Sequence, residues 1–395
     1  MRIALPRWIA AVFYGGPRHK AGTLARTIGA PWHLAVATLP MLLGIAMCLL
    51  LQIVDPYDLR PWGFPPKFVD ANYPGSQTIY MMAARTREPH DLALFGGSTM
   101  MAVTPAQLHA VFDVKAPVNL SYPLPSPEDS AMIMMHLVKT PGMRRIVMGV
   151  DYSQMGNDGV AYATGQLAMQ SFSPRWFDMP DFNLRTIQAT ARRAMGKPLD
   201  TATWRLEPAS YYDAPRLTAQ PDLLALLDDS VVHPSPDMFV QPRLPGCRSY
   251  RFINRVVIPV GRAAQARGIA VDLLFPPLLP AALYNWQKRP LMMSSWTKGA
   301  DYRQLIHFHE CIALVVAEEK LDAVKVHATD NDLVLTGDLN NYRDTVHLTA
   351  PAALLRLMTD VRDGRFVLTT SGMEAYSGTM EKAIRSAGTQ RYGKH

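Results

Sequence analysis

The sequence predicts an α/β fold: a parallel sheet flanked by helices in a three-layer, flavodoxin-like arrangement. Residues 92–95 form a continuous apolar run of strand length, which is typical of a strand buried on both faces. Further apolar runs alternate with helical patterns as far as residue 370. This β-α-β rhythm indicates parallel strands joined by right-handed crossovers. All strand ends should therefore share one carboxyl edge, where open α/β sheets bind ligands.

The individual elements follow from caps and breakers. Thr104 and Ser126 each precede a proline, the pattern of an N-cap followed by the first helical position. Gly268 marks the end of a helix. The expected strands are 92–95, 116–120, 145–150, 269–275, 323–327 and an edge strand at 366–369. The expected helices are 105–112, one that opens at Ser126, 182–195, 221–229, 248–267, 301–319, 350–362 and 373–385.

The net positive charge of the chain is concentrated at the amino terminus. Residues 1–32 contain five basic residues and no acid, so they hold +5 of the formal net charge of +7. Only +2 is left for the other 363 residues. The positive charge is therefore a property of this segment, and no nucleic-acid partner is expected.

A stretch of 21 residues without charge, residues 34–54, is long enough to cross a hydrocarbon core of about 30 Å. We interpret residues 33–54 as one transmembrane helix in a bacterial inner membrane, with residues 1–32 cytoplasmic and the rest of the chain periplasmic. The alternative is a cleaved signal peptide, whose apolar region would be only about 7–15 residues long. A lipoprotein site at Cys48 is disfavoured because Met47 is not small.

Beyond the apolar stretch we expect a stalk at 55–90, a main domain at 91–370, and a C-terminal helix and tail at 371–395. Residues 153–245 interrupt the rhythm with recurring prolines and aromatic residues. A long insertion of this kind is usually a lid or a partner surface, and we expect it to wall the cleft at the carboxyl edge. Its aromatic side chains could stack on sugar rings or belong to a core.

Two glycines and a serine follow the first strand. Gly96 and Gly97 allow tight or left-handed backbone conformations, so Ser98 can be presented beyond the strand end. A serine becomes a good nucleophile when a base takes its proton and a third group orients the base. Asp344 and His347 are three residues apart, a spacing that places both on one face of a helical turn. We expect the side chains of Ser98, Asp344 and His347 to meet, with the first and last strands near each other in the sheet. The alternative is that the Gly-Gly-Ser turn is an ordinary strand-to-helix turn with a purely structural role.

Four blocks in this order resemble the SGNH, or GDSL-like, hydrolases. They are residues 94–100 with Gly-Gly-Ser, 118–129, 146–152, and 341–347 with Asp-x-x-His. More narrowly, the chain resembles the membrane-anchored members found in bacterial envelope polysaccharide operons, relatives of the alginate and cellulose acetylation proteins and of D-alanyl transfer proteins. The resemblance spans residues 88–365.

The resemblance implies a serine O-acyltransferase or esterase, for acetyl above all, that acts on an exopolysaccharide. Ser98 would be the nucleophile, His347 the base and Asp344 the orienting acid. The implied partners are the polysaccharide, the inner membrane, and a membrane acyl-donor protein or a polysaccharide synthase complex, with no cofactor. The competing interpretation is a non-catalytic accessory that binds glycan or braces the synthase complex.

The residues around the nucleophile match the family less closely. Leu124 lies near the position of the family's oxyanion glycine, and Asp151 replaces its oxyanion asparagine. Backbone N–H groups at the start of a helix remain as oxyanion donors. These candidates are Gly97, Ser98 and Thr99. The expected substrate contacts are Asn119, Asp151 and Tyr152.

Three other patterns in the sequence are weaker signals, for a metal site, a disulfide and a phosphate site. Residues 307–310 contain two histidines and a glutamate, but side chains two apart on a helix point different ways, so a solvated face is expected and no metal site is predicted. Cys247 and Cys311 could pair in an oxidising compartment, which the sequence leaves open. A phosphate site at residues 96–99 is disfavoured because no lysine follows in the Walker pattern.

Overall fold

The computed structural model describes residues 38–47, 49–50, 53, 89–121, 125–150, 152–155, 191, 195, 215–232, 244–285 and 302–390. The chain divides into two compact units, Met1–Asp55 and Pro56–His395. In the first unit, residues 38–47 are helical and mostly exposed. No helix among the described residues has both the length and the hydropathy needed to cross a membrane. Residues 1–32, part of the expected span at 33–54 and nearly all of the expected stalk lie outside the described residues.

The second unit contains a five-stranded sheet with the order β2-β1-β3-β4-β5. The strands are β1 (Leu92–Phe95), β2 (Pro117–Asn119), β3 (Arg145–Gly149), β4 (Ala270–Leu274) and β5 (Val324–His327). Every neighbouring pair is parallel. The predicted parallel sheet is confirmed, and each of these strands begins and ends within one residue of its expected position. The strand order reverses between β1 and β3, so a crevice is expected at the carboxyl ends of these two strands.

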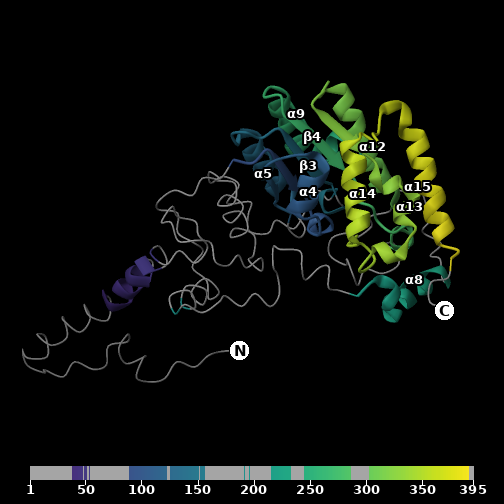
Figure 1. Cartoon of the computed structure of the whole chain (residues 1–395), viewed down its shortest axis with the longest axis horizontal. Helices are drawn as coiled ribbons and strands as arrows, with labels where there is room; N and C mark the ends of the chain where they lie inside the picture. Colours follow the sequence, from purple (N-terminus) through teal and green to yellow (C-terminus); the bar gives the residue numbers. More distant parts are fainter. Residues whose placement is uncertain are drawn as a thin grey trace, which may run out of the picture. The chain divides into compact units, whose positions relative to one another are not determined.

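Helices cover both faces of the sheet (Figure 1). The α-helices are α4 (Pro105–Phe112), α5 (Pro127–Lys139), α8 (Pro221–Val232), α9 (Ile258–Gln265), α10 (Pro280–Asn285), α12 (Tyr302–Glu318), α13 (Leu333–Thr336), α14 (Pro351–Arg362) and α15 (Met373–Ala387). The short 3-10 turns used below are η1 (Ser98–Met100), η2 (Tyr152–Gln154), η4 (Leu217–Ala219), η6 (Cys247–Ser249), η8 (Thr329–Asn331) and η9 (Leu339–Asn341). The expected helix at 182–195 lies almost entirely outside the described residues.

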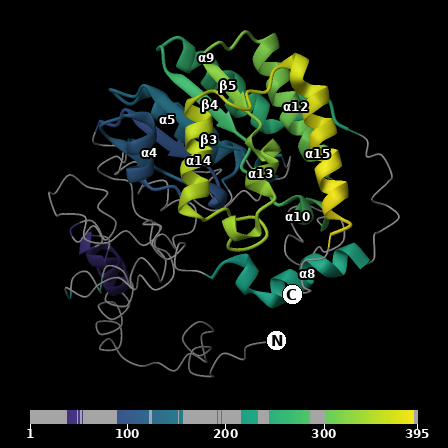
Figure 2. The same cartoon turned by 45° about the vertical axis from the view of Figure 1, so that its right-hand side comes forward.

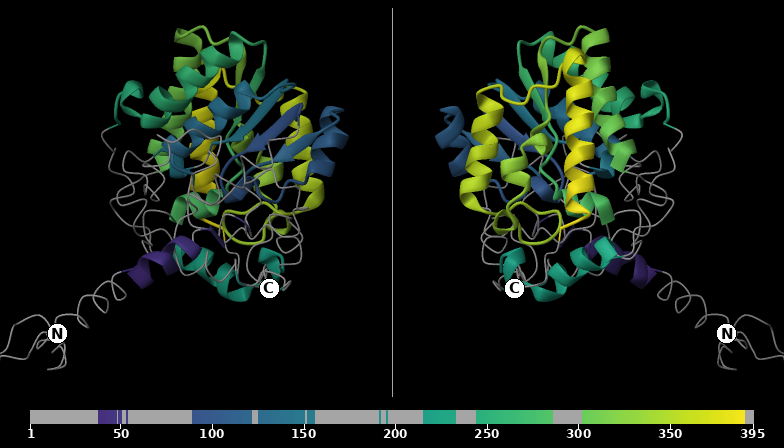
Figure 3. Two further views of the ribbon diagram at one scale, coloured as in Figure 1. Left: turned by 90° about the vertical axis from the view of Figure 1, so that its left-hand side faces the viewer. Right: turned by 90° about the vertical axis from the view of Figure 1, so that its right-hand side faces the viewer.

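Alternation along the strands produces the two layers of core. Phe95 and Met148 point to the face that α5, α9 and α12 cover, and they belong to one hydrophobic cluster. Leu94 and Val147 point to the opposite face, where α4 and α14 supply the second cluster. Figure 2 shows α14 crossing in front of the sheet, and both views in Figure 3 show the sheet between helices. The sheet is therefore buried on both faces, as its continuous apolar strands predict.

Local side-chain chemistry sets the helix starts. Thr104 Oγ1 accepts the N–H of Gln107 at 3.1 Å, and Gln107 Oε1 accepts the N–H of Thr104 at 2.8 Å. Ser126 and Asp129 form the same reciprocal box at the start of α5. Gly268, with φ +66°, takes the left-handed conformation that follows α9. These boundaries could be predicted because each depends on neighbours within a few residues.

The helix expected at 248–267 is interrupted. It consists of η6, a π-helical turn at Ile253–Val257, and α9. Pro259 lies in the first turn of α9 and has no N–H to donate to the preceding turn. We attribute the wider turn before it to this missing donor.

The edge strand expected at 366–369 is also wrong. The segment forms only an isolated antiparallel bridge between His327 and Val367. Phe366 has φ 55°, a left-handed conformation that breaks an extended run. The β-branched and aromatic composition of this segment predicted a strand, but one residue in the left-handed region prevents it.

A disulfide joins Cys247 to Cys311 and so decides a pairing that the sequence leaves open. Cys247 begins η6, directly after the insertion, and Cys311 is fully buried on α12. The bond therefore fastens the returning end of the insertion to a central helix.

A buried polar network holds α15 in place. The Tyr376 hydroxyl donates to Asp330 Oδ2 at 2.8 Å and accepts a hydrogen bond from His309 Nδ1 at 2.7 Å. All three side chains are buried, and the His309 ring stacks on Phe275 with a centroid distance of 3.5 Å. Burial, together with the negative charge of Asp330, raises the pKa of Tyr376. The expectation that His309 belongs to a solvated helix face is wrong, because α15 covers this side of α12.

We predict that Tyr376→Phe lowers the free energy of unfolding by about 1–3 kcal/mol, because it removes the hydroxyl with which a buried carboxylate and a buried imidazole N–H, themselves 3.3 Å apart, both form hydrogen bonds. Denaturant unfolding of the full chain measures this loss.

Tyr250→Phe is the matched control. Tyr250 is also buried, but its hydroxyl has no hydrogen-bond partner among the described residues. Its removal should change stability by less than about 0.5 kcal/mol or should stabilise the fold. Equal losses in the two variants would show that the network does not hold α15.

Candidate functional site

Close packing, rather than an unusual backbone conformation, positions Ser98 beyond β1. Gly97 has φ −77° and Gly96 has no positive φ, so of the tight and left-handed conformations that glycine allows, this turn does not use the left-handed one. The glycine at position 96 is needed for space: a Cβ there would lie 2.8 Å from Met100 Cγ and 3.1 Å from the carbonyl oxygen of Gly149. The turn η1 therefore lies directly against the end of β3 and presents Ser98 at the carboxyl edge.

Asn119, expected to contact substrate, has another role. Its Nδ2 donates to the carbonyl oxygens of Met100 at 3.0 Å and Val103 at 2.7 Å. Its Oδ1 accepts the N–H of Ser121 at 2.9 Å. The Asn119 side-chain amide at the end of β2 thus binds the backbone that follows Ser98, and in this way it positions the turn that carries the nucleophile.

The path of the chain to His347 differs from the expected one. β3 and β4 lie between β1 and β5, so the first and last strands are not neighbours. After β5 the chain passes through η8, α13 and η9, and this long loop returns to the end of β1. The expectation that Ser98 and His347 could meet only through nearby strands is wrong, because a loop of some twenty residues can span three strand spacings of about 4.8 Å each.

The Asp344–His347 segment is not helical. It is a bend closed by an antiparallel bridge between Tyr342 and Leu348. Asp344 Oδ1 accepts the backbone N–H groups of Val346 at 3.0 Å and His347 at 2.9 Å. The aspartate side chain therefore shapes its own turn, as Asx turns do, and this brings the carboxylate beside the imidazole.

Tyr342 anchors this loop. Its side chain is completely buried, and its hydroxyl donates to the carbonyl oxygen of Pro277, just beyond β4, at 3.3 Å. Asn341 Nδ2 donates to the carbonyl oxygen of Leu335 at 3.0 Å, and the Asn341 carbonyl accepts the N–H of Thr349 at 2.9 Å. Burial of the Tyr342 phenol raises its pKa, so it stays neutral at any ordinary pH.

The described end of the insertion lies against the same loop. Leu217 is fully buried and donates its N–H to the carbonyl oxygen of Tyr342 at 2.8 Å. The Gln220 side chain donates to the carbonyl oxygen of Arg343. Thr218 Oγ1 donates to Asn340 Oδ1 at 2.9 Å. The contacts of η4 therefore reach the loop that carries His347, at the carboxyl edge of the sheet.

Ser98, His347 and Asp344 form one hydrogen-bonded chain. His347 Nε2 lies 2.9 Å from Ser98 Oγ. His347 Nδ1 lies 2.7 Å from Asp344 Oδ2 and 2.8 Å from Asp344 Oδ1. Because a carboxylate only accepts, Nδ1 carries the proton and Nε2 is left to accept the serine hydroxyl. The side chains of His347 and Asp344 are 16% and 21% exposed, so the site is reachable from solvent but largely enclosed.

The Asp344 carboxyl is held in its ionised form. Burial alone would raise its pKa, but the hydrogen bond and charge of His347 and the two backbone N–H groups lower it to about 2. Arg343 adds a cation 3.4 Å from Asp344 Oδ2. A permanently negative Asp344 stabilises the imidazolium that forms when His347 accepts a proton.

The residues expected to bind the oxyanion or the substrate lie near the start of η1 and in η2, or outside the described part of the chain. The first N–H groups that η1 uses belong to Met100 and Met101, so the N–H groups of Ser98 and Thr99 precede the hydrogen-bonded turn. Such groups can face a developing oxyanion. Tyr152 is half-buried in η2 and packs against the hydrophobic cluster of α5, α9 and α12. Asp151 and Leu124 lie outside the described residues.

Sequence reasoning missed three supporting residues. In the sequence, Tyr342 and Gln220 resemble ordinary loop residues, and Gly149 resembles the last residues of a strand. A Cβ on Gly149 would lie 2.3 Å from Met100 Cγ, so this glycine makes room for the nucleophile turn. A local signal existed only for Tyr342, an aromatic residue two positions before the Asp-x-x-His block.

No family model matches the chain, and no curated protein matches it either.

We predict that Asn119→Ala costs about 1–3 kcal/mol of stability, because it leaves two carbonyls and one N–H unpaired. Displacement of Ser98 should also slow its labelling by a serine-directed phosphonate by about 10–100-fold. Denaturant unfolding and the rate of adduct formation measure the two effects.

Asn331→Ala is the control for this substitution. The Oδ1 atom of Asn331 is buried and has no partner among the described residues, so its loss should leave labelling unchanged. If Asn119→Ala labels as fast as the unmodified chain, Asn119 does not position the nucleophile.

Proposed function

We propose that this chain is an SGNH-type serine O-acyltransferase or esterase that acts on acetyl esters of a cell-envelope polysaccharide. The observation that carries the proposal is the chain of hydrogen bonds from Ser98 Oγ through His347 to Asp344. Nucleophile, base and orienting group in this order are what serine catalysis requires. The site also lies at the carboxyl edge, beside the point where the strand order reverses.

The first half-reaction would transfer the acyl group to the protein. Ser98 Oγ attacks the ester carbonyl while His347 Nε2 takes the hydroxyl proton. The tetrahedral oxyanion faces the N–H groups of Ser98 and Thr99. His347 then returns the proton to the leaving alcohol, and the acyl group stays on Ser98.

The second half-reaction decides between the two activities. His347 deprotonates either water, which makes the chain an esterase, or a sugar hydroxyl, which makes it a transferase. The triad is the same in both cases. The choice of an envelope polysaccharide as substrate rests on the resemblance of the four sequence blocks to polysaccharide-modifying SGNH proteins, and it implies an acyl-donor protein in the membrane.

We expect Ser98→Ala and His347→Ala each to reduce hydrolysis of a small chromogenic acetyl ester by about 10⁴-fold or more. Asp344→Asn should cost less, about 10²–10⁴-fold, because the amide oxygen can still accept the N–H groups of Val346 and His347 while the imidazole loses its anionic partner. Initial rates of the purified full-length variants measure this order.

Ser121→Ala is the matched serine control. Ser121 follows β2, is buried, and its hydroxyl has no partner among the described residues. It should keep full activity and phosphonate labelling, with the adduct on Ser98. Activity that survives in Ser98→Ala would remove the catalytic proposal.

A non-catalytic accessory is the second candidate. Leu124 and Asp151, which replace the oxyanion residues of the family, favour it. In that case Ser98→Ala would leave both esterase activity and glycan acylation in cells unchanged, whereas disruption of the insertion would abolish binding to glycan or to the synthase complex.

The proposed location is the periplasmic side of the inner membrane. The uncharged stretch at 34–54, with its basic residues on one side, supports an anchor of this orientation. The disulfide between Cys247 and Cys311 supports an oxidising compartment for the main domain, because disulfides are rare in the reducing cytosol.

Reporter fusions test this topology. A reporter enzyme that is active only in the periplasm should work when it is fused after Arg60 and fail when it is fused after Trp32. A cytoplasmic reporter should give the opposite pair of results. If the Arg60 fusion is active only in the cytoplasm, the proposed orientation is wrong.

A further inference from the structure

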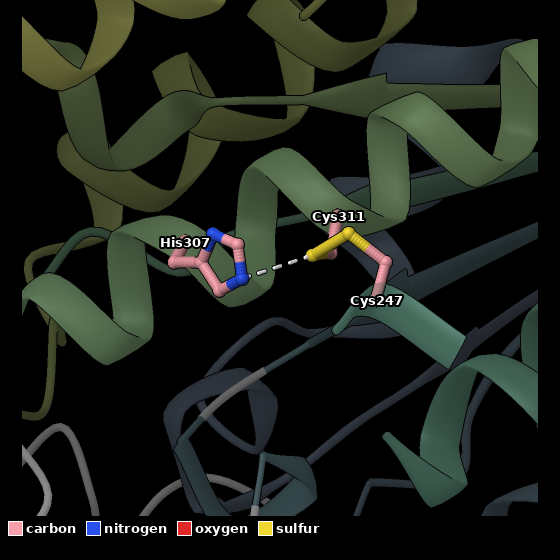
Figure 4. A group of neighbouring side chains, drawn as sticks. All are labelled: Cys247, His307 and Cys311. Atoms are coloured by element: carbon pink, nitrogen blue, oxygen red, sulfur yellow. Dashed lines mark hydrogen bonds between the residues drawn. A yellow bond between two sulfur atoms is a disulfide. The ribbon is translucent and has the colours of Figure 1, made fainter. Parts of the chain in front are cut away.

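Three ligand-type side chains meet away from the Ser98 site. Cys247 lies at the start of η6, and His307 and Cys311 lie one turn apart on the same face of α12. Figure 4 shows the imidazole of His307 directed at the sulfur pair. One donor atom from each of the three side chains lies within 4.8 Å of the other two.

The geometry of this cluster fits a tetrahedral metal once the sulfurs are separate. Zinc binds thiolate sulfur at about 2.3 Å and imidazole nitrogen at about 2.0–2.1 Å, which places neighbouring S and N ligands about 3.6 Å apart. His307 Nε2 lies 3.4 Å from Cys311 Sγ. The helix already holds two of the three ligands at the separation that a tetrahedral site requires.

We propose that reduction of the Cys247–Cys311 disulfide creates a Zn²⁺ site formed by Cys247, His307 and Cys311. A dithiol reductant supplies two electrons and two protons to the S–S bond and becomes a disulfide itself. Zn²⁺ then displaces both thiol protons to solvent, forms two Zn–S bonds, and accepts the lone pair of His307 Nε2. A water molecule fills the fourth position.

Metal binding changes one contact of His307. In the oxidised protein its Nε2 donates to the carbonyl oxygen of Pro245 at 2.8 Å, and this hydrogen bond is given up when the proton moves to Nδ1 and Nε2 binds the metal. His307 also lines a cavity of about 330 Å³ together with Glu310 and Ser377. Of the three proposed ligands His307 alone lines this cavity, which would give the ion access to the imidazole side of the site.

The site has a structural consequence. The disulfide joins the end of the insertion to α12, and a metal bound to the same two sulfurs would keep this connection when the disulfide is absent. The chain would therefore hold η6 against α12 both before and after oxidation. This inference does not depend on the proposed acyl-transfer activity.

Cobalt binding tests the proposal in the full-length Cys48→Ser variant, which removes the only other cysteine. After reduction with a phosphine and removal of excess reductant, one Co²⁺ per chain should bind, with thiolate-to-cobalt charge-transfer absorption and the visible bands of tetrahedral Co²⁺. Zn²⁺ should displace it and should raise the thermal unfolding temperature of the reduced protein. The oxidised protein should show neither effect.

Variants assign the ligands. Combined Cys247→Ser and Cys311→Ser substitutions should abolish the charge-transfer bands, and His307→Gln should weaken Co²⁺ binding by at least about 100-fold. His136→Gln, on α5, is the histidine control and should bind normally. The proposal is overturned if the reduced protein binds no Co²⁺, if binding persists without these ligands, or if the reduced chain unfolds and Zn²⁺ does not restore its fold.

Discussion

The burial of Tyr342 is the constraint on which the candidate site depends. The strand that precedes His347 lies at the edge of the sheet, with two strands between it and β1, so sheet topology alone does not bring His347 to Ser98. The loop must return across the carboxyl edge and stay there. The fully buried ring of Tyr342, hydrogen-bonded to the backbone beyond β4, supplies an attachment on that path. The imidazole can then reach Ser98 from a rigid base.

Asp344 combines two tasks in one carboxylate. It accepts two backbone N–H groups and so shapes the turn, and it accepts the imidazole Nδ1–H and so sets its tautomer. The hydrogen bond and charge of His347, followed by the two backbone N–H groups, outweigh the effect of burial and hold the carboxyl ionised, with a pKa of about 2. One residue therefore sets both the geometry and the electrostatics of the loop. This explains how a short, irregular segment can hold the Asp344 carboxylate and the His347 imidazole in line with Ser98 Oγ.

The described residues 215–232 of the insertion lie against the loop that carries His347. Leu217 binds the backbone of that loop, and Cys247, just beyond the insertion, is bonded to α12. The position of η4 beside this loop suits the cleft wall of an enzyme that accepts a large polymer and equally suits a binding surface. The enzyme and the non-catalytic accessory thus differ mainly in the role of Ser98, whereas both would bind glycan in a similar place.

Local sequence patterns were enough to predict the α/β class, the limits of the five strands, most helix starts, and the candidates Ser98, Asp344 and His347. These features depend on apolar periodicity, caps and short motifs, which act over a few residues. The tertiary structure alone decided the strand order, the return of the loop, the pairing of the cysteines, and the positioning role of Asn119. Each of these depends on contacts between residues far apart in the chain, and hydrogen bonds or burial of that kind leave no periodic trace in the local sequence.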